Sequence, residues 1–410
     1  MQNRKIKTVF IVGAGFSYHA GLPLTSQFTE ALLEGRQFRS GPSRVLVEFL
    51  RGFIRQAFGH DKSNKAGHWP DLEDLFTCVD LSANSGHHLG SHFSPAHLRT
   101  VRRALLARII RMLDHRYRMR HRNKLSGAER NLDSLFRTFD AREVAFVSMN
   151  WDTVIERKLS TISLFPAIDY CCDAVAALVP RLPERDELES ERSYFRRLPR
   201  YQEITAAALP ISWGVHEKSV PVVKIHGSAN WLYCDCCRGL FWFQPEASDR
   251  LSNQLVTADD LSRIARFLKP RFRRQIESSD FTVFRTKLRC LSCDNVELGT
   301  RIATFSYRKA LDFPMFHKSW FAAEELLRFA ESWVFIGYSL PAADYEFKYL
   351  LKSVQLSRRR SPRFVVISGG TKPDIERTYS NYQRFFGNVV NSRTFLDHGL
   401  DAKAVDVACA

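Results

Sequence analysis

The chain lacks a hydrophobic run long enough to cross a membrane. Apolar residues make up 45% of its 410 residues, but no stretch approaches the roughly 20 uninterrupted apolar residues that a membrane-spanning helix needs. Residues 1–7 are polar and lead directly into a strand-like segment, which leaves no room for a signal peptide. We therefore expect a cytoplasmic protein with no membrane partner.

Acidic side chains are the minority charge. There are 44 of them against 60 basic ones, which gives a formal net charge of +16. Such an excess favours polyanionic partners such as nucleic acid or nucleotides. The alternative is a soluble protein whose exposed faces are rich in arginine, and charge alone does not distinguish the two. Contact with nucleic acid stays open, and we expect it to be indirect.

Cysteines number nine, an odd count, and five of them lie in two tight clusters. In a reducing compartment such clusters more often bind metal than form disulfides. Cys234/Cys237 and Cys290/Cys293 form two CxxC pairs, whose four thiolates suit the tetrahedral coordination of structural zinc. Cys236 competes with Cys234 or Cys237 as a ligand. The other cysteines show no such pattern and are expected to be ordinary thiols: Cys78, Cys171, Cys172 and Cys409.

Five short apolar runs predict buried strands, because each is continuous and rich in β-branched or aromatic residues. They are Thr8–Val12, Val144–Met149, Val222–Ile225, Trp333–Ile336 and Phe364–Ile367. Several are followed by a polar turn and then by a helical pattern, which is typical of a doubly wound, mostly parallel α/β sheet of Rossmann-like build. Ligands of such sheets bind at the carboxyl ends of the strands. The polar residues that follow the runs should therefore converge on one site.

The sequence between the runs predicts two additions to this sheet, a helical insertion and a small zinc module. The expected division is as follows: 1–34, 141–233 and 300–400 form the nucleotide-binding domain, 35–140 a mainly helical insertion, 234–299 the zinc module and 401–410 a tail. Within the insertion, one helix has an apolar stripe made of Leu98, Val101, Leu105, Ile109 and Met112. Its opposite face carries Arg99, Arg102, Arg103, Arg108 and Arg111. We interpret this face as solvated, in preference to a surface for nucleic acid or a partner.

A glycine-rich loop follows the first run, with Gly13, Ala14, Gly15 and Ser17 in close succession. Glycines directly after a first strand let the backbone approach a pyrophosphate. The alternative is a purely structural turn between strand and helix. The spacing departs from the dehydrogenase fingerprint, and no acidic residue ends a second strand about 20 residues further on. These departures argue against an ordinary NAD dehydrogenase.

Polar residues also follow the second and third runs. Asn150 and Asp152 come directly after the second run, where they are either ligand-binding residues or a turn and a helix N-cap. His226 follows the third run and precedes a glycine, and it is the only histidine in such a setting. A single histidine is still more often a structural hydrogen-bonding group than a catalyst.

Read together, these motifs resemble the sirtuin family. Its members carry, in this order, Gly-Ala-Gly-Phe-Ser with a following Gly-Leu-Pro, then Asn-x-Asp, and then His-Gly-Ser immediately before a CxxC pair. Gly337-Tyr338-Ser339-Leu340, after the fourth run, is similar to the family's late ribose-contacting turn. The matches span residues 9–345, although most of the intervening sequence is unmatched.

The resemblance implies that NAD is the substrate, and it implies a role for each matched residue. Asn150 would orient a water molecule or the nicotinamide ribose, Asp152 would hold the carboxamide, and His226 would act as general base. The other matched residues would contact the rest of NAD: Gly13, Ala14, Gly15 and Ser17 the phosphates, and Gly337 and Ser339 the adenosine side.

Three departures separate this chain from deacylating sirtuins. Those enzymes follow Gly-x-Pro with an acidic-Phe-Arg element, whereas Pro23 is followed here by Leu-Thr-Ser; they carry Gln where this chain has Met149; and they lack a helical insertion as large as 35–140. Inside the insertion, 71–76 (Asp-Leu-Glu-Asp-Leu-Phe) resembles the E-D-L-F element of prokaryotic sirtuin-like NAD hydrolases used in anti-phage defence. The resemblance therefore favours an NAD glycohydrolase that releases nicotinamide and ADP-ribose.

Two other functions stay open. Retention of the zinc module supports an NAD-dependent protein-lysine deacylase, which the missing Phe-Arg element opposes. The fold could also serve a non-catalytic binding or assembly subunit, against which the intact Asn150 and His226 argue. A toxic NAD hydrolase must be held in check. We therefore expect a homo-oligomer or a partner protein such as an ATPase or a sensor subunit.

Overall fold

The structure, a computed structural model, centres on a seven-stranded sheet with the order β14-β13-β12-β1-β2-β7-β3. It describes residues 5–34, 41–59, 69–122, 127–161, 167–181, 183–184, 186, 189–190, 193–194, 197–207, 219–276, 286–295, 298–300, 302 and 314–410. Every pair of neighbours in this sheet is parallel. The strands are β1 (Thr8–Val12), β2 (Val144–Ser148), β3 (Ala167–Asp169), β7 (Ser219–Lys224), β12 (Ser332–Ile336), β13 (Arg363–Ile367) and β14 (Phe395–Leu396).

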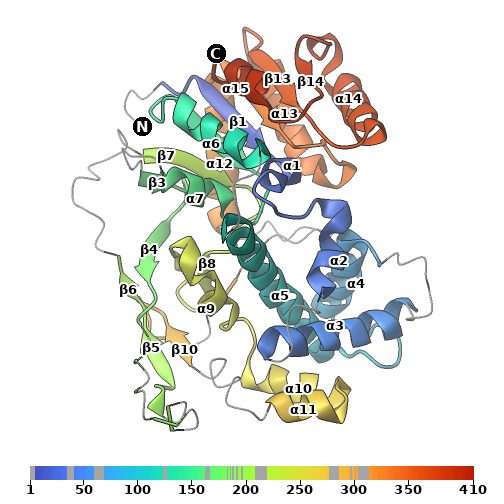
Figure 1. Ribbon diagram of the computed structural model, residues 1–410, viewed down its shortest axis with the longest axis vertical. Coiled ribbons are helices and arrows are strands. Elements are labelled where there is room, and N and C mark those ends of the chain that lie inside the picture. The colour runs from blue at the N-terminus through green and yellow to red at the C-terminus, as the bar shows by residue number, and fades with distance from the viewer. Residues whose placement is uncertain are drawn as a thin grey trace.

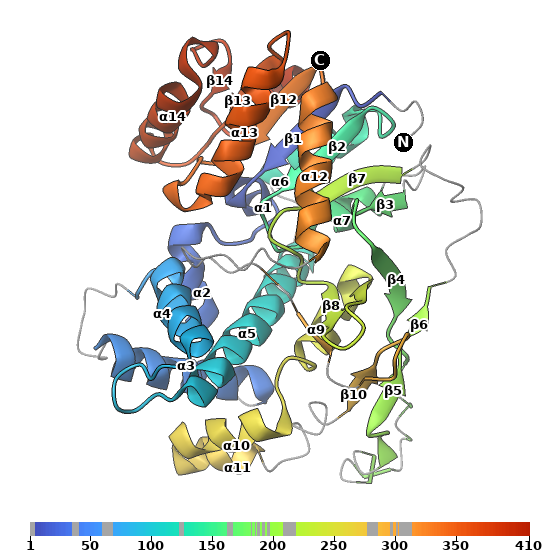
Figure 2. The same ribbon diagram turned by 180° about the vertical axis from the view of Figure 1, so that it is seen from behind.

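The five apolar runs are the strands β1, β2, β7, β12 and β13, which confirms the predicted doubly wound α/β fold. Their side chains alternate between two cores. Phe10 and Val12 face the core that contains α6 (Gly127–Thr138) and α15 (Ala402–Cys409). Val9 and Ile11 face the core that contains α12 (Pro314–Phe329), α13 (Tyr345–Ser357) and α14 (Lys372–Phe386). The sheet is therefore covered on both faces, as Figures 1 and 2 show from opposite sides.

The order of the strands reverses at β1. From β1 the chain proceeds to β2 and β7 on one side, and it returns to build β12, β13 and β14 on the other side. The gap between the loops that follow β1 and β12 is thus a topological switch point, where open α/β sheets bind their ligands. The glycine-rich loop follows β1, and Gly337 follows β12.

A helical part extends beyond the carboxyl edge of this sheet (Figure 1). Its elements are α2 (Phe28–Leu33), α3 (Pro42–Phe58), α4 (Leu72–Ser85), α5 (Pro95–Arg122), α9 (Ser248–Ser252), α10 (Ala258–Phe267) and α11 (Pro270–Ile276). The long helix α5 contacts α2, α3, α4, α9 and α10. It runs from the far end of the helical part toward the sheet. α10 and α11 come from the sequence between the two CxxC pairs, yet they pack on α3.

Helix α5 corrects one expectation, because of the five arginines on the face interpreted as solvated only Arg99 is exposed. Arg108 is completely buried and donates to the backbone carbonyl of Glu34 at 3.1 Å. Burial and the nearby charge of Arg111 lower the pKa of the Arg108 guanidinium to about 10. Arg102 forms an ion pair with Asp80, and Arg103 forms one with Asp260 of α10. The 3.6-residue periodicity showed one apolar stripe, but α5 is surrounded by other helices on most of its sides, so its arginines make inter-helix contacts.

Two smaller sheets carry the cysteines. One has the order β11-β8-β9-β4-β6 and the other pairs β10 with β5. Their strands are β4 (Ala174–Leu178), β5 (Tyr201–Glu203), β6 (Thr205–Ala206), β8 (Trp231–Cys234), β9 (Leu240–Trp242), β10 (Lys287–Arg289) and β11 (Leu298–Gly299). Among the residues that the structure describes, no helix is long and apolar enough to span a membrane.

Candidate functional site

The glycines at the switch point bring two backbones into direct contact. A Cβ at Gly13 would lie 2.7 Å from the carbonyl oxygen of Gly337, and a Cβ at Gly337 would lie 2.2 Å from the backbone nitrogen of Phe16. Gly337 also has a φ of +60°, which side chains other than glycine rarely adopt. The N–H groups of Gly13 and Gly15 donate to the carbonyls of Ile336 and Gly337. At this contact between residues 13–16 and Gly337, which we call the glycine crossing, there is no room for a Cβ atom. The N–H groups of Gly13 and Gly15 are already hydrogen-bonded within the protein.

Asn150 reaches from the end of β2 into this crossing. Its side-chain nitrogen donates to the carbonyl of Gly13 at 2.8 Å and to the Ser17 hydroxyl at 2.9 Å. That hydroxyl donates in turn to Asp152 Oδ2 at 2.6 Å, between two buried side chains. The other oxygen of Asp152 accepts the N–H of Val154 at the start of α7 (Val154–Leu159). Asp152 thus makes the structural turn that the sequence allowed, and it also belongs to a polar cluster with Asn150 and Ser17.

His226 lies two residues after the end of β7, the strand next to β2, with 5% of its surface exposed. Its Nδ1 lies 3.2 Å from the carbonyl oxygen of Met149, the residue before Asn150. A carbonyl only accepts, so this contact places the proton on Nδ1, and in the neutral ring Nε2 then carries the lone pair. Nε2 lies 3.8 Å from Asp344 Oδ1. The Met149 carbonyl and the Asp344 carboxylate thus face the two ring nitrogens of His226.

Asp344, beside His226, and its partner Tyr338 were not predicted from the sequence as site residues. Asp344 lies just before α13, and its Oδ2 accepts the hydroxyl of Tyr338 at 3.0 Å. Burial and the charge of Asp344 raise the pKa of the Tyr338 phenol well above its ordinary value, so this phenol stays protonated as a donor. Asp344 follows the late Gly-Tyr-Ser turn by only a few residues, which is the signal that could have indicated it.

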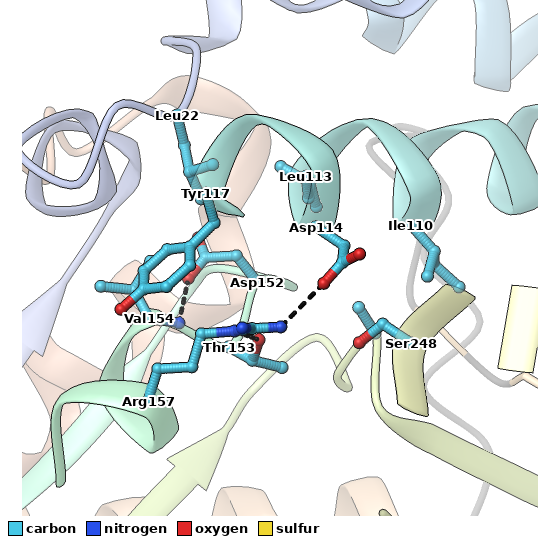
Figure 3. A pocket seen from close by; sticks show the side chains of 11 residues that line it. Leu22, Ile110, Leu113, Asp114, Tyr117, Asp152, Thr153, Val154, Arg157 and Ser248 are labelled. Atoms are coloured by element: carbon cyan, nitrogen blue, oxygen red, sulfur yellow. Dashed lines mark hydrogen bonds and ion pairs between the residues drawn. The ribbon is translucent and has the colours of Figure 1, made fainter. Parts of the chain in front are cut away.

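A small, partly open pocket lies next to Asp152. Its wall includes Asp152, Thr153 and Val154 from the loop after β2, and Asp114 and Tyr117 from α5, as Figure 3 shows. The other lining residues are Leu22, Ile110, Leu113, Arg157, Ala229 and Ser248. The helical part therefore supplies one wall of the space beside the candidate residues.

Arg157 is the cationic group of this wall. Its guanidinium lies 4.6 Å from the centre of the Tyr117 ring and donates to Asp114 at 2.8 Å (Figure 3). It also donates to the carbonyl of Pro245 at 2.9 Å and to the Thr153 hydroxyl at 3.3 Å. Burial raises the pKa of the Tyr117 phenol. Arg157 thus fixes α5 against the loop that carries Asp152.

The acidic element at the start of α4 approaches the same loop through its apolar residues. Leu72, Leu75 and Phe76 are buried, and the Phe76 ring meets the Trp151 ring edge-on, with 6.2 Å between the ring centres. Trp151 stands between Asn150 and Asp152 in the sequence. The E-D-L-F element, residues 71–76, therefore packs directly against the loop 150–152, which we call the candidate loop.

The four cysteines of the CxxC pairs come together as predicted. The Sγ atoms of Cys234, Cys237, Cys290 and Cys293 lie within 4.8 Å of one another. Cys234 and Cys293 are 3.6 Å apart, and Cys237 and Cys290 are 3.5 Å apart. Thiolates at about 2.3 Å from a tetrahedral zinc are about 3.8 Å apart, so this donor set fits structural zinc. Cys236, the competing ligand, is exposed and is not one of the four.

The remaining candidates lie at the edge of this site. Ser339 is exposed, and its carbonyl accepts the Asn381 side-chain amide at 3.1 Å. Ala14 begins α1 (Ala14–Tyr18). The structure thus groups Ser17, Asn150 and Asp152 tightly and places His226 just after the adjacent strand β7. The individual roles of all these residues, including Gly337 and Ser339, stay predictions.

Comparison with solved structures finds sirtuin enzymes. One, described as the structural basis for the mechanism and regulation of Sir2 enzymes, is 12% identical, with 99% of this chain and 90% of that chain covered and a TM-score of 0.35. A Sir2 variant with a deacetylated p53 peptide and 3′-O-acetyl ADP-ribose is 14% identical, with coverages of 99% and 92% and a TM-score of 0.34. Sir2 with a p53 peptide and NAD⁺ is also 14% identical, with the same coverages and a TM-score of 0.31.

Neither a protein-family model nor a curated protein matches the sequence. At TM-scores this low, the likeness to the solved structures carries no argument about this chain. The fold assignment therefore rests on the strand order, and the function on the geometry of the site and the sequence motifs.

Proposed function

We propose that this chain hydrolyses NAD to nicotinamide and ADP-ribose. The observation that carries the proposal is the meeting of Ser17, Asn150 and Asp152 at the switch point, with His226 just after the neighbouring strand β7. Side chains from three separate segments of the chain converge there, beside a small pocket that Asp152 helps to line. The sirtuin-like order of the motifs supports NAD as the molecule that occupies this place.

The chemistry of the proposed reaction suits these groups. Cleavage of the bond between nicotinamide and ribose develops positive charge on the sugar, and fixed dipoles in a water-poor pocket stabilise such a centre. Asn150 would orient the ribose or the attacking water, and Asp152 would hold the carboxamide of the leaving nicotinamide. His226 Nε2 would remove a proton from water or from a ribose hydroxyl. The glycine crossing would lie against the phosphates, and Ser339 would contact the adenosine side.

The helical part supports hydrolysis over transfer to a protein. α5 lines the pocket, and the segment after Pro23 forms a short turn, η1 (Thr25–Gln27), followed by α2, in place of the acidic-Phe-Arg element. The four-cysteine cluster is what favours the second candidate, an NAD-dependent deacylase. We further propose that the hydrolase is a triggered effector of anti-phage defence, restrained by self-assembly or by a partner protein.

The test resolves the products that purified protein forms from NAD, with and without an acetyl-lysine peptide. We expect nicotinamide and ADP-ribose without the peptide. His226→Ala should reduce nicotinamide release at least about 100-fold, since general-base catalysis alone contributes this much. Asn150→Ala should reduce it by a similar factor, since the loss of one fixed dipole at a developing charge costs about 100-fold or more. Both variants should remain folded by circular dichroism. His97→Ala is the matched control, because His97 packs edge-on against Phe267 in the helical part.

Nicotinamide release that strictly requires the acylated peptide would replace hydrolysis by deacylation. Near-parental turnover in either variant would remove that residue from the mechanism. If the parent protein binds NAD but releases no nicotinamide in any assembly state, the chain is a binding subunit.

A further inference from the structure

A fully buried lysine ends β7, two residues before His226. Lys224 pairs in register with Ser148, the last residue of β2, and none of its surface is exposed. Its ammonium lies 2.5 Å from the carbonyl oxygen of Asp152, 3.1 Å from Glu156 Oε1 and 3.5 Å from the carbonyl oxygen of Asn150. An ammonium has three hydrogens to donate, and these three acceptors surround it.

Two of the three acceptors belong to the backbone of the candidate loop. A buried charge is costly unless it is paired and hydrogen-bonded. Glu156, on α7 and 2% exposed, supplies the opposite charge. The carbonyls of Asn150 and Asp152 flank Trp151, so Lys224 holds the loop at two points. A neutral apolar side chain in its place would fill the space but would leave both carbonyls without this donor.

The same lysine connects the loop to the segment that carries His226. Glu156 Oε1 accepts the Tyr170 hydroxyl at 3.0 Å, and that hydroxyl accepts the Asn230 amide at 3.1 Å. Asn230 in turn accepts the Ser228 hydroxyl at 2.7 Å, two residues after His226. A direct backbone bond also joins the N–H of Ala229 to the carbonyl of Trp151 at 2.7 Å. The two loops are thus linked by continuous hydrogen bonds behind the candidate site.

We propose that Lys224 is a positioning residue of the candidate active site. Its ammonium fixes the backbone of the 150–152 loop relative to the His226 segment, so that the Asn150 amide and the His226 ring face the same reacting bond. Lys224 acts through Asn150 and Asp152 and does not contact the substrate itself. The inference rests on the proposed function for its effect on turnover, but its effect on the loop is independent of NAD.

A second buried lysine provides the matched control. Lys158, on the same helix as Glu156, is 3% exposed, and its ammonium lies 2.7 Å from Asp133 and 3.6 Å from Glu129. It contacts side chains on α5 and α6 rather than the carbonyls of the 150–152 loop. Both lysines are buried and paired with carboxylates, but only Lys224 donates to the carbonyls of the 150–152 loop.

The experiment compares K224M/E156Q with K158M/D133N in the full chain. K224M/E156Q removes both charges of its pair and so avoids an uncompensated buried carboxylate. K158M/D133N removes the closer pair of Lys158 and leaves Glu129 next to His121, whose Nε2 lies 2.6 Å away. The amide that E156Q introduces keeps an acceptor for Tyr170. We expect kcat for NAD cleavage to fall roughly 100-fold in K224M/E156Q, as for a misplacement of about 1 Å, with KM changed far less. K158M/D133N should keep the parental kcat.

Amide hydrogen exchange is the second readout, and it requires no catalysis. The N–H groups of Met149, Asn150 and Val154 are hydrogen-bonded in the structure. Their exchange should accelerate in K224M/E156Q and stay parental in K158M/D133N. If K224M/E156Q does not fold, K224Q, which keeps an amide donor, is measured in its place.

The outcomes separate this inference from the proposed function. Unchanged exchange over 149–154 overturns the positioning role, whether or not the parent cleaves NAD. Faster exchange with a parental kcat overturns it for catalysis. A third outcome combines two results: the parent protein never releases nicotinamide, and exchange is faster in K224M/E156Q. This outcome overturns the proposed hydrolase and supports the structural role of Lys224.

Discussion

Two buried ion pairs in this molecule use the same chemistry for different purposes. In the helical part, Arg103 of α5 donates to Asp260 of α10 through two nitrogens, at 2.7 and 2.6 Å. At the sheet edge, Lys224 of β7 pairs with Glu156 of α7 at 3.1 Å. Both carboxylates are almost fully buried, and both cations come from a different element. In each case the pair joins segments that are far apart in the sequence.

The difference lies in what else each group contacts. Asp260 also accepts the Thr100 hydroxyl at 2.6 Å and the backbone N–H of Thr257 at 2.9 Å, so its bonds return to the two helices that it joins. Lys224 instead reaches two carbonyls of a loop that carries candidate catalytic residues. A pair whose other hydrogen bonds stay within the two helices that it joins stabilises the fold. A pair that is also hydrogen-bonded to the backbone of a loop fixes the position of that loop. The first pair should therefore affect stability alone, and the second should affect turnover.

The largest expected effect on stability comes from removing the charge of Asp260. Asp260→Asn keeps the volume of the side chain but leaves Arg103 without its partner and presents an amide to the donor hydroxyls. Breaking a buried pair costs about 3–5 kcal/mol, and we expect the lower end because the Arg103 side chain is one-third exposed. Urea unfolding followed by circular dichroism measures this loss.

The neighbouring Asp259→Asn serves as the control, since this aspartate is exposed in the same first turn of α10. It should cost less than about 0.5 kcal/mol, as surface substitutions usually do. Under conditions where it is folded, Asp260→Asn should cleave NAD at the parental rate. A loss of turnover with intact stability would remove the distinction between the two pairs.

Acid should reveal the Asp260 pair through the stability of the parent protein. Burial alone would raise the pKa of this carboxyl, but the hydrogen bonds and charge of Arg103 outweigh it and hold the pKa below its ordinary value. A carboxyl whose pKa is lower in the folded state contributes stability that is fully present above the unfolded pKa of about 3.9 and is lost as pH falls through the folded pKa.

The difference in unfolding free energy between the parent and Asp260→Asn should consequently be constant near neutral pH and shrink below about pH 4. Urea midpoints of both proteins across this range test the sign. A difference that grows toward acid would mean that the carboxylate is destabilised by burial and that Arg103 does not compensate for it.

The strands and the four-cysteine cluster could be predicted from the sequence because their signals are local. Continuous apolar runs identified β1, β2, β7, β12 and β13, whereas β3 and β14 are only three and two residues long and present no run. The CxxC spacing brought the right four thiols together. Asn150 and His226 were identified because each follows a strand of one parallel sheet, whose carboxyl ends share an edge.

The polar pairs could not be predicted, because they depend on which helices surround a given residue. Lys224 and Glu156 lie on elements separated by a long stretch of sequence, and nothing local indicates that they meet. The arginines of α5 look like a solvated face because periodicity shows where the apolar stripe lies, not whether other helices cover the remaining faces. Asp260, Ser43 and Ser252, which bind these arginines, come from three different segments.

The smallest expected effect is at Arg99, which tests how far the buried character of α5 extends. Arg99 is the exposed arginine near the start of the helix, and its one hydrogen bond in the described structure is to the carbonyl of Ala83 at 3.3 Å. Arg99→Ala should change the unfolding free energy by less than about 0.5 kcal/mol and leave NAD cleavage unchanged. Arg103→Ala should cost several times more, because it leaves Asp260 buried without its main partner. Urea midpoints measure both losses of stability. Equal losses for the two variants would mean that helix propensity along α5 matters more than the ion pair. The contrast between the helical part and the sheet edge would then have no energetic basis.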